Sequence, residues 1–255
     1  MRAALGALTL TLLAALTSCT PATERSAYAA PPGERQPVVL ELFSSEGCSS
    51  CPPADTLLAA LSRGQPVPGA DVIALELHVD YWDDLGWSDP FSSAAYSARQ
   101  RAYGAAFKQR GIYTPQLVVD GHAELLGSDA GRAKEAIAAA AQAPKARVTV
   151  AAKDGKLVIS VADVPGPREP SSVWLAITEE GLHTDVPRGE NAGARLAHGP
   201  IVRRLSRLGA ADPAFSGEAA AALDPAWKRE NTRAVVFVQN DRTLQILGAN
   251  TASLR

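Results

Sequence analysis

The chain has 255 residues, of which 46% are hydrophobic and 20% charged, and its formal net charge is −2. This length allows one large domain or two small ones, and the composition excludes intrinsic disorder, which requires low hydrophobicity and high net charge. The 25 Lys and Arg residues balance 27 Asp and Glu residues, so no nucleic-acid partner is expected. Three cysteines, Cys19, Cys48 and Cys51, are too few for a disulfide-rich scaffold.

Residues 1–18 have the features of a signal peptide. The uncharged apolar run 3–16 follows a basic start and is shorter than the about 20 residues of a membrane-spanning helix. It leads into Leu-Thr-Ser-Cys, which resembles the bacterial lipobox. That resemblance implies cleavage before Cys19, a lipid anchor on its sulfur and, from Thr20, an outer-membrane lipoprotein. The alternative is secretion with cleavage after Ala29; both routes predict a location in the cell envelope on the periplasmic side, or outside the cell, where disulfides persist.

Residues 19–37 are rich in proline and charge and are expected to form a flexible tether. The region 38–143 then alternates between short apolar runs and helical patterns, which predicts an α/β domain of order β-α-β-α-β-β-α. The expected elements are a strand 38–43, a helix 53–62, a strand 72–79, a helix from the cap at 88–90 to residue 110, a hairpin of 116–119 and 122–126 turning at Asp120-Gly121, and a helix from 128–129 to about 142.

Residues 144–255 have a different pattern, with apolar residues alternating at period two. Several short strands at this spacing predict a small all-β, sandwich-like domain. The expected strands are 147–151, 157–161, 173–178, 234–239 and 244–247.

The chemistry concentrates at Cys48 and Cys51, which lie between the first strand and the first helix. Reaction sites of open α/β sheets gather at this edge, and a helix N-terminus stabilises a thiolate over a thiol. Two intervening residues allow the sulfurs to form a reducible disulfide or to share a metal. Cys48 is expected to be the exposed nucleophile and Cys51 the resolving thiol. Thr114-Pro115 precedes the third strand, where a cis proline would let Thr114 present its backbone to a peptide; the alternative is a trans proline ending a loop.

Together these residues resemble the thioredoxin superfamily, and more closely the secreted bacterial domain-of-unknown-function family 1223. The resemblance implies a thioredoxin-like domain followed by a β-domain, with no established activity. It covers nearly all of the mature chain through the segments 43–55, 78–83, 85–87, 99–101, 113–116 and 189–193.

The chain departs from thioredoxins around its cysteines. Thioredoxins have a tryptophan directly before the first cysteine, where this chain has Gly47. They also carry a buried carboxylate at the position of Leu42. The neighbouring Glu41 shares a face with Val39 and Phe43, so it is either a buried proton acceptor or a solvated or ion-paired side chain. The direction of the redox reaction therefore stays open.

The segment 78–82 ends the second strand beside the first. His78 or Asp80 could transfer protons to the cysteines and Trp82 could bind a partner; the alternative is that all three only anchor the following loop. Residues 189–193, Gly-Glu-Asn-Ala-Gly, are interpreted as a turn rather than a binding loop.

Three functions remain. The first is an extracytoplasmic thiol–disulfide oxidoreductase that acts on protein, peptide or small-molecule disulfides and needs no cofactor. The second is a non-catalytic envelope binding lipoprotein whose Cys48–Cys51 disulfide is structural. The third is a copper chaperone using Cys48, Cys51 and His78. No structural metal is expected, because one Cys-x-x-Cys motif without a second Cys/His pair at zinc spacing is weak evidence for zinc. Haem attachment is also excluded, because it requires histidine after the second cysteine and Pro52 follows Cys51.

Overall fold

A computed structural model describes Met1 and residues 35–255. The predictions for residues 2–34, including the signal peptide, lipidation of Cys19 and most of the tether, lie outside the described residues. Within the described part, no helix has the length and hydrophobicity needed to cross a membrane.

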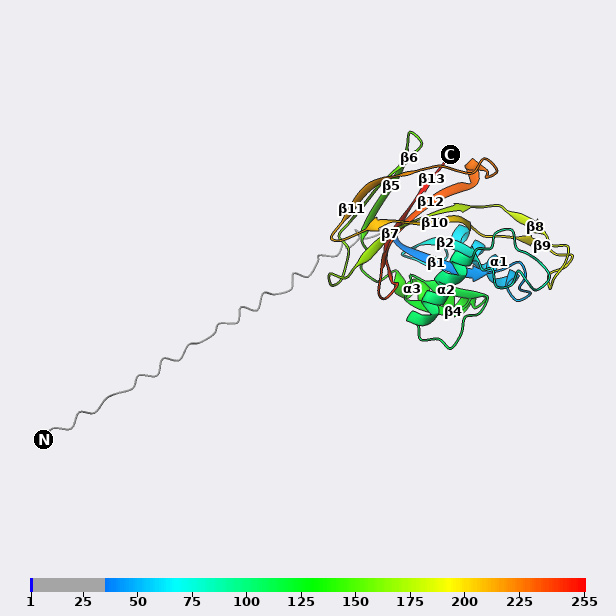
Figure 1. Cartoon of the computed structure of the whole chain (residues 1–255), viewed down its shortest axis with the longest axis horizontal. Helices are drawn as coiled ribbons and strands as arrows, with labels where there is room; N and C mark the ends of the chain where they lie inside the picture. Colours follow the sequence, from blue (N-terminus) through cyan, green and yellow to red (C-terminus); the bar gives the residue numbers. More distant parts are fainter. Residues whose placement is uncertain (2–34) are drawn as a thin grey trace.

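The described residues form a mixed α/β structure in which strands predominate (Figure 1). Its elements are β1 (Gln36–Ser44), α1 (Pro52–Gly64), β2 (Ala70–His78), α2 (Ala94–Ala106), β3 (Gln116–Val119), β4 (Ala123–Leu126), α3 (Ala130–Ala140), β5 (Arg147–Lys153), β6 (Lys156–Ala162), β7 (Ser171–Glu179), β8 (His183–Asp185), β9 (Arg195–Ala197), β10 (Ile201–Ala210), β11 (Phe215–Ala220), the 3₁₀ helix η1 (Arg229–Asn231), β12 (Thr232–Asn240) and β13 (Ile246–Ser253). The element order predicted for 38–143 is confirmed.

One eight-stranded sheet runs through the molecule in the order β13-β12-β7-β10-β2-β1-β3-β4. β1 and β2 are parallel, and β10 continues the sheet by pairing in parallel with β2 through Ile201 and Glu76. Four C-terminal strands therefore extend the N-terminal sheet instead of forming a separate all-β unit, which corrects that part of the expected fold. The pairing of β10 with β2 could not be predicted from the sequence, because arginines at 203, 204 and 207 interrupt the apolar pattern of β10.

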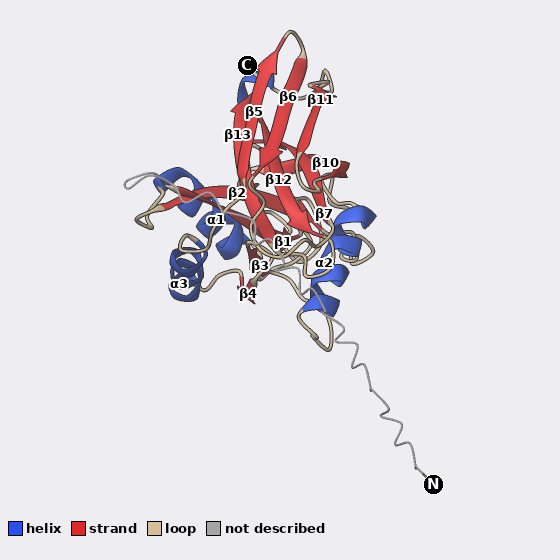
Figure 2. Ribbon diagram, turned by 90° about the vertical axis from the view of Figure 1, so that its left-hand side faces the viewer, coloured by secondary structure: helices blue, strands red, loops and turns tan. Residues whose placement is uncertain are grey.

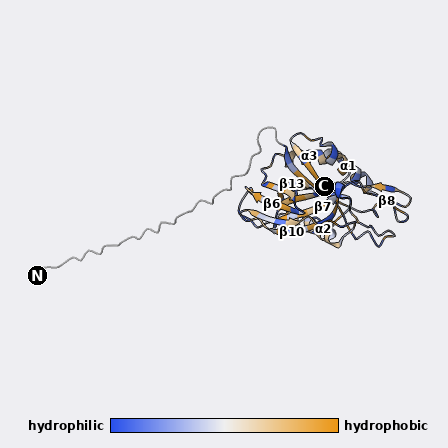
Figure 3. Cartoon of the chain, turned by 90° about the horizontal axis from the view of Figure 1, so that it is seen from above, coloured by the Kyte–Doolittle hydropathy of each residue, from blue (hydrophilic) through white to orange (hydrophobic). Residues whose placement is uncertain are grey.

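Both faces of the large sheet are covered (Figure 2). Helices α1 and α3 pack on one face against the even-numbered side chains of β1, such as Leu40 and Leu42, whereas α2 covers the opposite face through Tyr96 and Tyr103. A three-stranded sheet, β11-β6-β5, packs against β7 and β12 in a third apolar cluster. Figure 3 shows hydrophobic colour on β6, one strand of this smaller sheet. The sandwich-like packing is thus confined to this part of the C-terminal region.

Local sequence explains the helix that follows the cysteines. Pro52 and Pro53 occupy its first two positions, where backbone N–H groups have no partner within the helix, so the missing donors cost little. Leu58 and Leu61 bury its inner face. Gln65 ends the helix in the left-handed conformation, with its N–H bonded to the carbonyl of Leu61.

Helix α2 is shorter than predicted. It begins at Ala94 with Ser93 as its cap. Oδ1 of Asp89 accepts from the N–H of Phe91 at 2.9 Å, as a cap would, but this bond closes only a local turn, and Oδ2 binds His78 and the N–H of Glu46. The helix ends at Ala106, and Lys108 has a positive φ of 56°, which stops any continuation toward residue 110.

Candidate functional site

Cys48 and Cys51 form a disulfide in the loop between β1 and α1, with their Cα atoms 5.4 Å apart. Cys51 is the N-cap residue of α1, so this sulfur lies at the partially positive end of the helix. Both cysteines have 0% exposed area, whereas Ser49 and Ser50 between them are exposed. The expected exposure of Cys48 is therefore wrong for the oxidised protein.

Trp82 connects the cysteine loop to Thr114. Its Nε1–H donates a hydrogen bond of 2.8 Å to Oγ1 of Thr114. Trp82 also lies close to the residue before Cys48, because a Cβ added to Gly47 would be 3.2 Å from Cβ of Trp82. The tryptophan is therefore in close contact with the cysteine loop. The Thr114–Pro115 peptide bond is cis, as the sequence suggested.

Pro115 lies near the first turn of α1. A Cβ on Gly127 would meet Cβ of Ala54 at 3.1 Å and Cβ of Pro115 at 3.2 Å, so these three residues share one small space. The structure therefore brings Trp82, Thr114 and Pro115 to the same end of the sheet as the cysteine pair.

Glu41 has a different environment from the one a proton acceptor for the cysteines would need. It points to the α2 face of the sheet, where Nε of Arg99 donates to Oε1 at 2.5 Å and Nη2 donates to Oε2 at 3.0 Å. The hydroxyl of Tyr103 donates to the same carboxylate. Of the two alternatives left open by the sequence, the structure shows the ion-paired one, although the pair is buried rather than solvated.

Asp80 is also held by a neighbouring element. Its backbone N–H donates to Oγ of Ser97 at 3.0 Å, and its Oδ1 accepts from the same hydroxyl at 2.5 Å. These bonds join the end of β2 to α2. They agree with the alternative in which Asp80 anchors the loop after β2. A role of Asp80 in proton transfer stays a prediction.

His78 lies in a buried network of acidic and histidine side chains. Its Nδ1 is 2.6 Å from Oδ2 of Asp89, and its Nε2 is 2.9 Å from Oε1 of Glu76. Burial alone would lower the pKa of His78, but the two carboxylates raise it well above its ordinary value. Glu76 is likewise buried, yet its close contacts with His198 and His78 hold its pKa down at about 2.

Asp55 is a buried carboxyl group that the sequence analysis did not identify. It lies four residues after Cys51 in α1, and residues at this spacing are neighbours on one helix face. Its Oδ1 accepts a 2.5 Å hydrogen bond from Oγ of Ser44. Burial, reinforced by the negative charge of Glu76, raises the pKa of Asp55 to about 8. The helical spacing therefore places this carboxyl on the same side of α1 as Cys51, with a pKa near neutral pH.

Replacing Asp55 by asparagine is expected to weaken the fall of stability with rising pH, leaving the part that His78 and His198, whose pKa values are also raised, contribute. In the folded protein this carboxyl loses its proton only near pH 8, whereas in the unfolded chain it does so near pH 4. Unfolding therefore releases a proton between these values, and the free energy of unfolding falls by up to about 1.4 kcal/mol per pH unit as the pH rises. Urea unfolding of the oxidised protein at about pH 5 and about pH 8 measures this fall.

The exposed Asp71→Asn variant is the matched control and is expected to keep the wild-type fall in stability. If Asp55→Asn shows the same decline as wild type and Asp71→Asn, Asp55 is not the neutral buried acid described here.

A loop from the second half of the chain covers the cysteines. Residues 189–193 lie at the tip of the β8–β9 hairpin, and Nδ2 of Asn191 donates to the carbonyls of Glu46 at 2.8 Å and Cys48 at 3.0 Å. Oε2 of Glu190 accepts from the N–H of Ser49 at 3.1 Å. The interpretation of 189–193 as merely a turn misses these contacts, which make it the cover of the disulfide.

Asn191→Ala is expected to make the disulfide easier to reduce. The change removes two hydrogen bonds that hold the loop closed, each worth about 0.5–1.5 kcal/mol, so the open form gains roughly 5–150-fold in population. The rate of reduction by a phosphine, followed by thiol labelling, should rise within that range. Asn250→Ala removes a similar side-chain bond to the carbonyl of Val148, far from the cysteines, and should leave the rate unchanged. Equal rates in both variants would contradict the role of the loop.

Comparison with known proteins gives a family match over most of the chain. A family described as "Protein of unknown function (DUF1223)" matches residues 39–239. The search of curated proteins finds no match.

Among solved structures, a structural-genomics crystal structure of a protein from Agrobacterium tumefaciens is similar, with 26% identity, a TM-score of 0.71 and coverage of 87% of this chain and 96% of that one. A domain of the outer membrane lipoprotein Omp28 from Porphyromonas gingivalis is 12% identical, covers 44% of this chain and 88% of its own, and has a TM-score of 0.24, which is too low to inform fold or function.

Proposed function

The chain belongs to the DUF1223 family, and we propose that it is an extracytoplasmic thiol–disulfide oxidoreductase whose redox centre is Cys48 and Cys51. The observation that carries this proposal is the disulfide at the N-terminus of α1, beside a buried acid at Asp55 and beneath a loop held by a few hydrogen bonds. A purely structural disulfide would not require a proton acceptor on the same helix face.

A thioredoxin-like arrangement of residues 38–143 is part of the same proposal. It is supported by the order of β1 to α3, by helices on both faces of the sheet, and by the cysteines and Thr114–Pro115 lying at one end of it. In this arrangement Thr114 and Trp82 would contact the substrate peptide once the loop 189–193 has moved.

The reaction we propose transfers two electrons. In the reduced protein, the Cys48 thiolate attacks one sulfur of a substrate disulfide, and the other substrate sulfur leaves as a thiolate that takes a proton from water. Cys51 gives its proton to the Asp55 carboxylate and attacks the Cys48 sulfur. The Cys48–Cys51 bond forms, the second substrate thiolate leaves, and the substrate is reduced while the protein is oxidised. The same steps in reverse oxidise a substrate dithiol.

The location of the protein also stays a proposal. Export through the predicted signal peptide, with a lipid anchor on Cys19 at the membrane, would place the cysteines where substrate disulfides persist and where protein or peptide thiols are the partners. This proposal rests on the sequence alone.

A non-catalytic binding protein with a structural disulfide is the second candidate, and the complete burial of both sulfurs favours it. A copper chaperone using His78 with both cysteines has less support, because within the described part of the chain His78 groups with Glu76 and His198.

Turnover assays in both directions separate the first two candidates. The reduced protein, recycled by a small dithiol, is expected to accelerate the reduction of insulin disulfides, or the oxidised protein to accelerate the oxidation of a reduced dithiol protein. The matched control is the same protein with both thiols alkylated after reduction. Turnover no faster than this control in both directions would exclude the oxidoreductase and leave the structural disulfide.

A further inference from the structure

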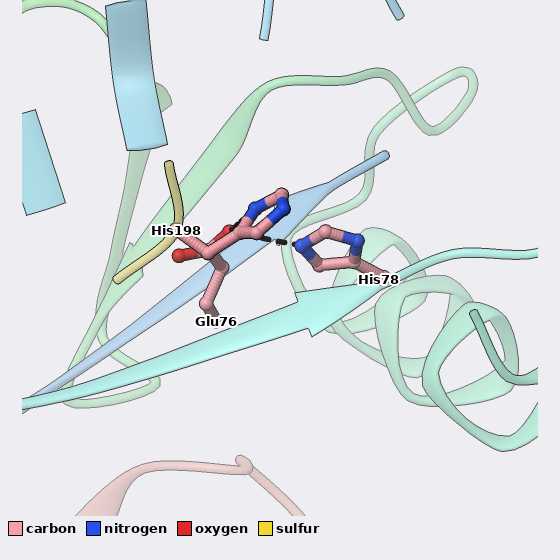
Figure 4. Close-up of side chains that lie close together, drawn as sticks. All are labelled: Glu76, His78 and His198. Atoms are coloured by element: carbon pink, nitrogen blue, oxygen red, sulfur yellow. Dashed lines mark hydrogen bonds and ion pairs between the residues drawn. The ribbon is translucent and has the colours of Figure 1, made fainter. Parts of the chain in front are cut away.

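We propose that Glu76, His78 and His198 form a binding site for a divalent transition-metal ion of the zinc type, next to the cysteine loop. Figure 4 shows the three side chains turned toward one another. Glu76 and His78 come from β2, and His198 directly follows β9, so the site joins the large sheet to the hairpin that carries the loop 189–193. The inference does not depend on the proposed redox activity.

The distances suit a metal ion. Each residue offers one ligand atom, and these atoms all lie within 4.8 Å of one another. Oε1 of Glu76 is 2.9 Å from Nε2 of His78 and 3.4 Å from Nδ1 of His198. Ligand atoms around a tetrahedral zinc ion lie roughly 3.3 Å apart, given bonds of about 2.0–2.2 Å. Small movements of the side chains would therefore accommodate the ion. Two imidazoles and a carboxylate favour a first-row divalent ion over Mg²⁺ or Ca²⁺.

The surrounding groups orient each ligand as in established metal sites. The ring nitrogen of each histidine that faces away from Glu76 meets a second carboxylate, Asp89 for His78 at 2.6 Å and Glu46 for His198 at 3.1 Å. Such carboxylate–histidine pairs fix the ring and its tautomer around bound metals. The remaining oxygen of Glu76, Oε2, accepts from the N–H of Gly199 at 2.5 Å, which aims Oε1 at the two rings.

Unsatisfied polar atoms supply an independent sign of a missing ligand. Both ring nitrogens of His198 and Oε1 of Glu46 are buried, and within the described residues they make no hydrogen bond of acceptable geometry. Buried polar atoms are almost always partnered in folded proteins. A metal on Nδ1 of His198 would satisfy that atom and fix Nε2–H as the donor to Glu46. Its two positive charges would also offset part of the charge of three buried carboxylates, Glu46, Glu76 and Asp89.

A surface cavity borders the site. A surface cavity of about 290 Å³ between α1 and the β8–β9 hairpin is lined by His198 and Gly199. Three protein ligands leave a fourth position open to water or a further donor. Because the ligands come from β2 and from the end of β9, a bound ion would also tie down the hairpin over the cysteines.

Zinc retention by the full-length mature protein tests this site. After treatment with chelator, loading with Zn²⁺ and gel filtration, the wild type should hold about one zinc per chain. A Cys48→Ser/Cys51→Ser double variant and the exposed His122→Gln control should hold the same amount, whereas Glu76→Gln should lose at least about 100-fold in affinity. No zinc in the wild type, full retention by Glu76→Gln, or loss in the double cysteine variant would each overturn the proposal.

A second measurement does not rely on variants that could fail to fold. Co²⁺ bound to the wild type, with its cysteines either oxidised or reduced, should give d–d absorption bands of a nitrogen and oxygen site without a thiolate-to-cobalt charge-transfer band. A thiolate band, or a spectrum identical to that of free Co²⁺, would contradict the site.

Discussion

Replacing Cys48 by serine is expected to bring disulfide turnover down to the rate without protein, a loss of about 10³-fold or more. Serine at this position fits the same space but its hydroxyl does not ionise near neutral pH, so neither the attack on a substrate sulfur nor the internal disulfide can form. Insulin reduction and dithiol oxidation, followed at equal protein concentration, measure the loss.

Ser50→Ala is the matched control for this change. Oγ of Ser50 lies 3.3 Å from the Cys48 sulfur on the exposed side of the loop, so its removal disturbs the same surroundings and leaves the thiol intact. We expect this variant to keep turnover within a few-fold of wild type. Turnover by Cys48→Ser equal to that of Ser50→Ala would remove Cys48 from the reaction.

The second large effect concerns stability. Arg99→Met is expected to lower the free energy of unfolding by about 3–5 kcal/mol, because it leaves the Glu41 carboxylate buried without its partner. The side chains of Arg99 and Glu41 are only 9% and 1% exposed. Arg99 also donates to Gln239 at 3.1 Å and lies over the rings of Trp174 and Phe237, so it joins β1 and α2 to strands of the C-terminal region.

Two comparisons make this prediction specific. Arg101→Met, on an exposed position of the same helix, should change stability by less than about 0.5 kcal/mol. Adding Glu41→Gln to Arg99→Met should recover part of the loss, because no buried charge then lacks a partner. Chemical denaturation of the three variants measures their free energies of unfolding. If Arg99→Met loses no more stability than Arg101→Met, the ion pair does not support the fold.

The sequence predicted the N-terminal half of the fold well because its signals are local. The apolar runs of β1 and β2, the proline-started helix α1 and the Asp120-Gly121 turn each depend on neighbouring residues; both turn residues have the positive φ that the predicted turn type requires. Strand β10 had no such signal. The guanidinium of Arg203 lies over the rings of Phe91 and Trp227 at 5.1 and 5.3 Å, so an arginine serves there as a packing residue.

The candidate site divides in the same way. The cysteine pair, Trp82 and Thr114-Pro115 could be recognised from short motifs. The covering loop could not, because Asn191 and its partner Glu46 are 145 positions apart, and only the β8–β9 hairpin brings them together. The same hairpin brings His198 next to Glu76 and His78, so this contact could not be predicted from the sequence either. Asp55 did carry a usable sign, its place four residues after Cys51 on the buried face of α1.

The most direct test of the central claim, that Cys48 is the attacking thiol and Cys51 the resolving one, is to trap the intermediate. Reduced Cys51→Ser, mixed with a peptide disulfide, should accumulate a mixed disulfide on Cys48, seen by intact-mass and peptide-mapping mass spectrometry, because no resolving thiol remains. Reduced Cys48→Ser should accumulate far less, since the proposed reaction gives the attack to Cys48 and only the resolving step to Cys51, the N-cap residue of α1. Absence of the adduct on Cys48, or equal adducts on both variants, would contradict the assignment.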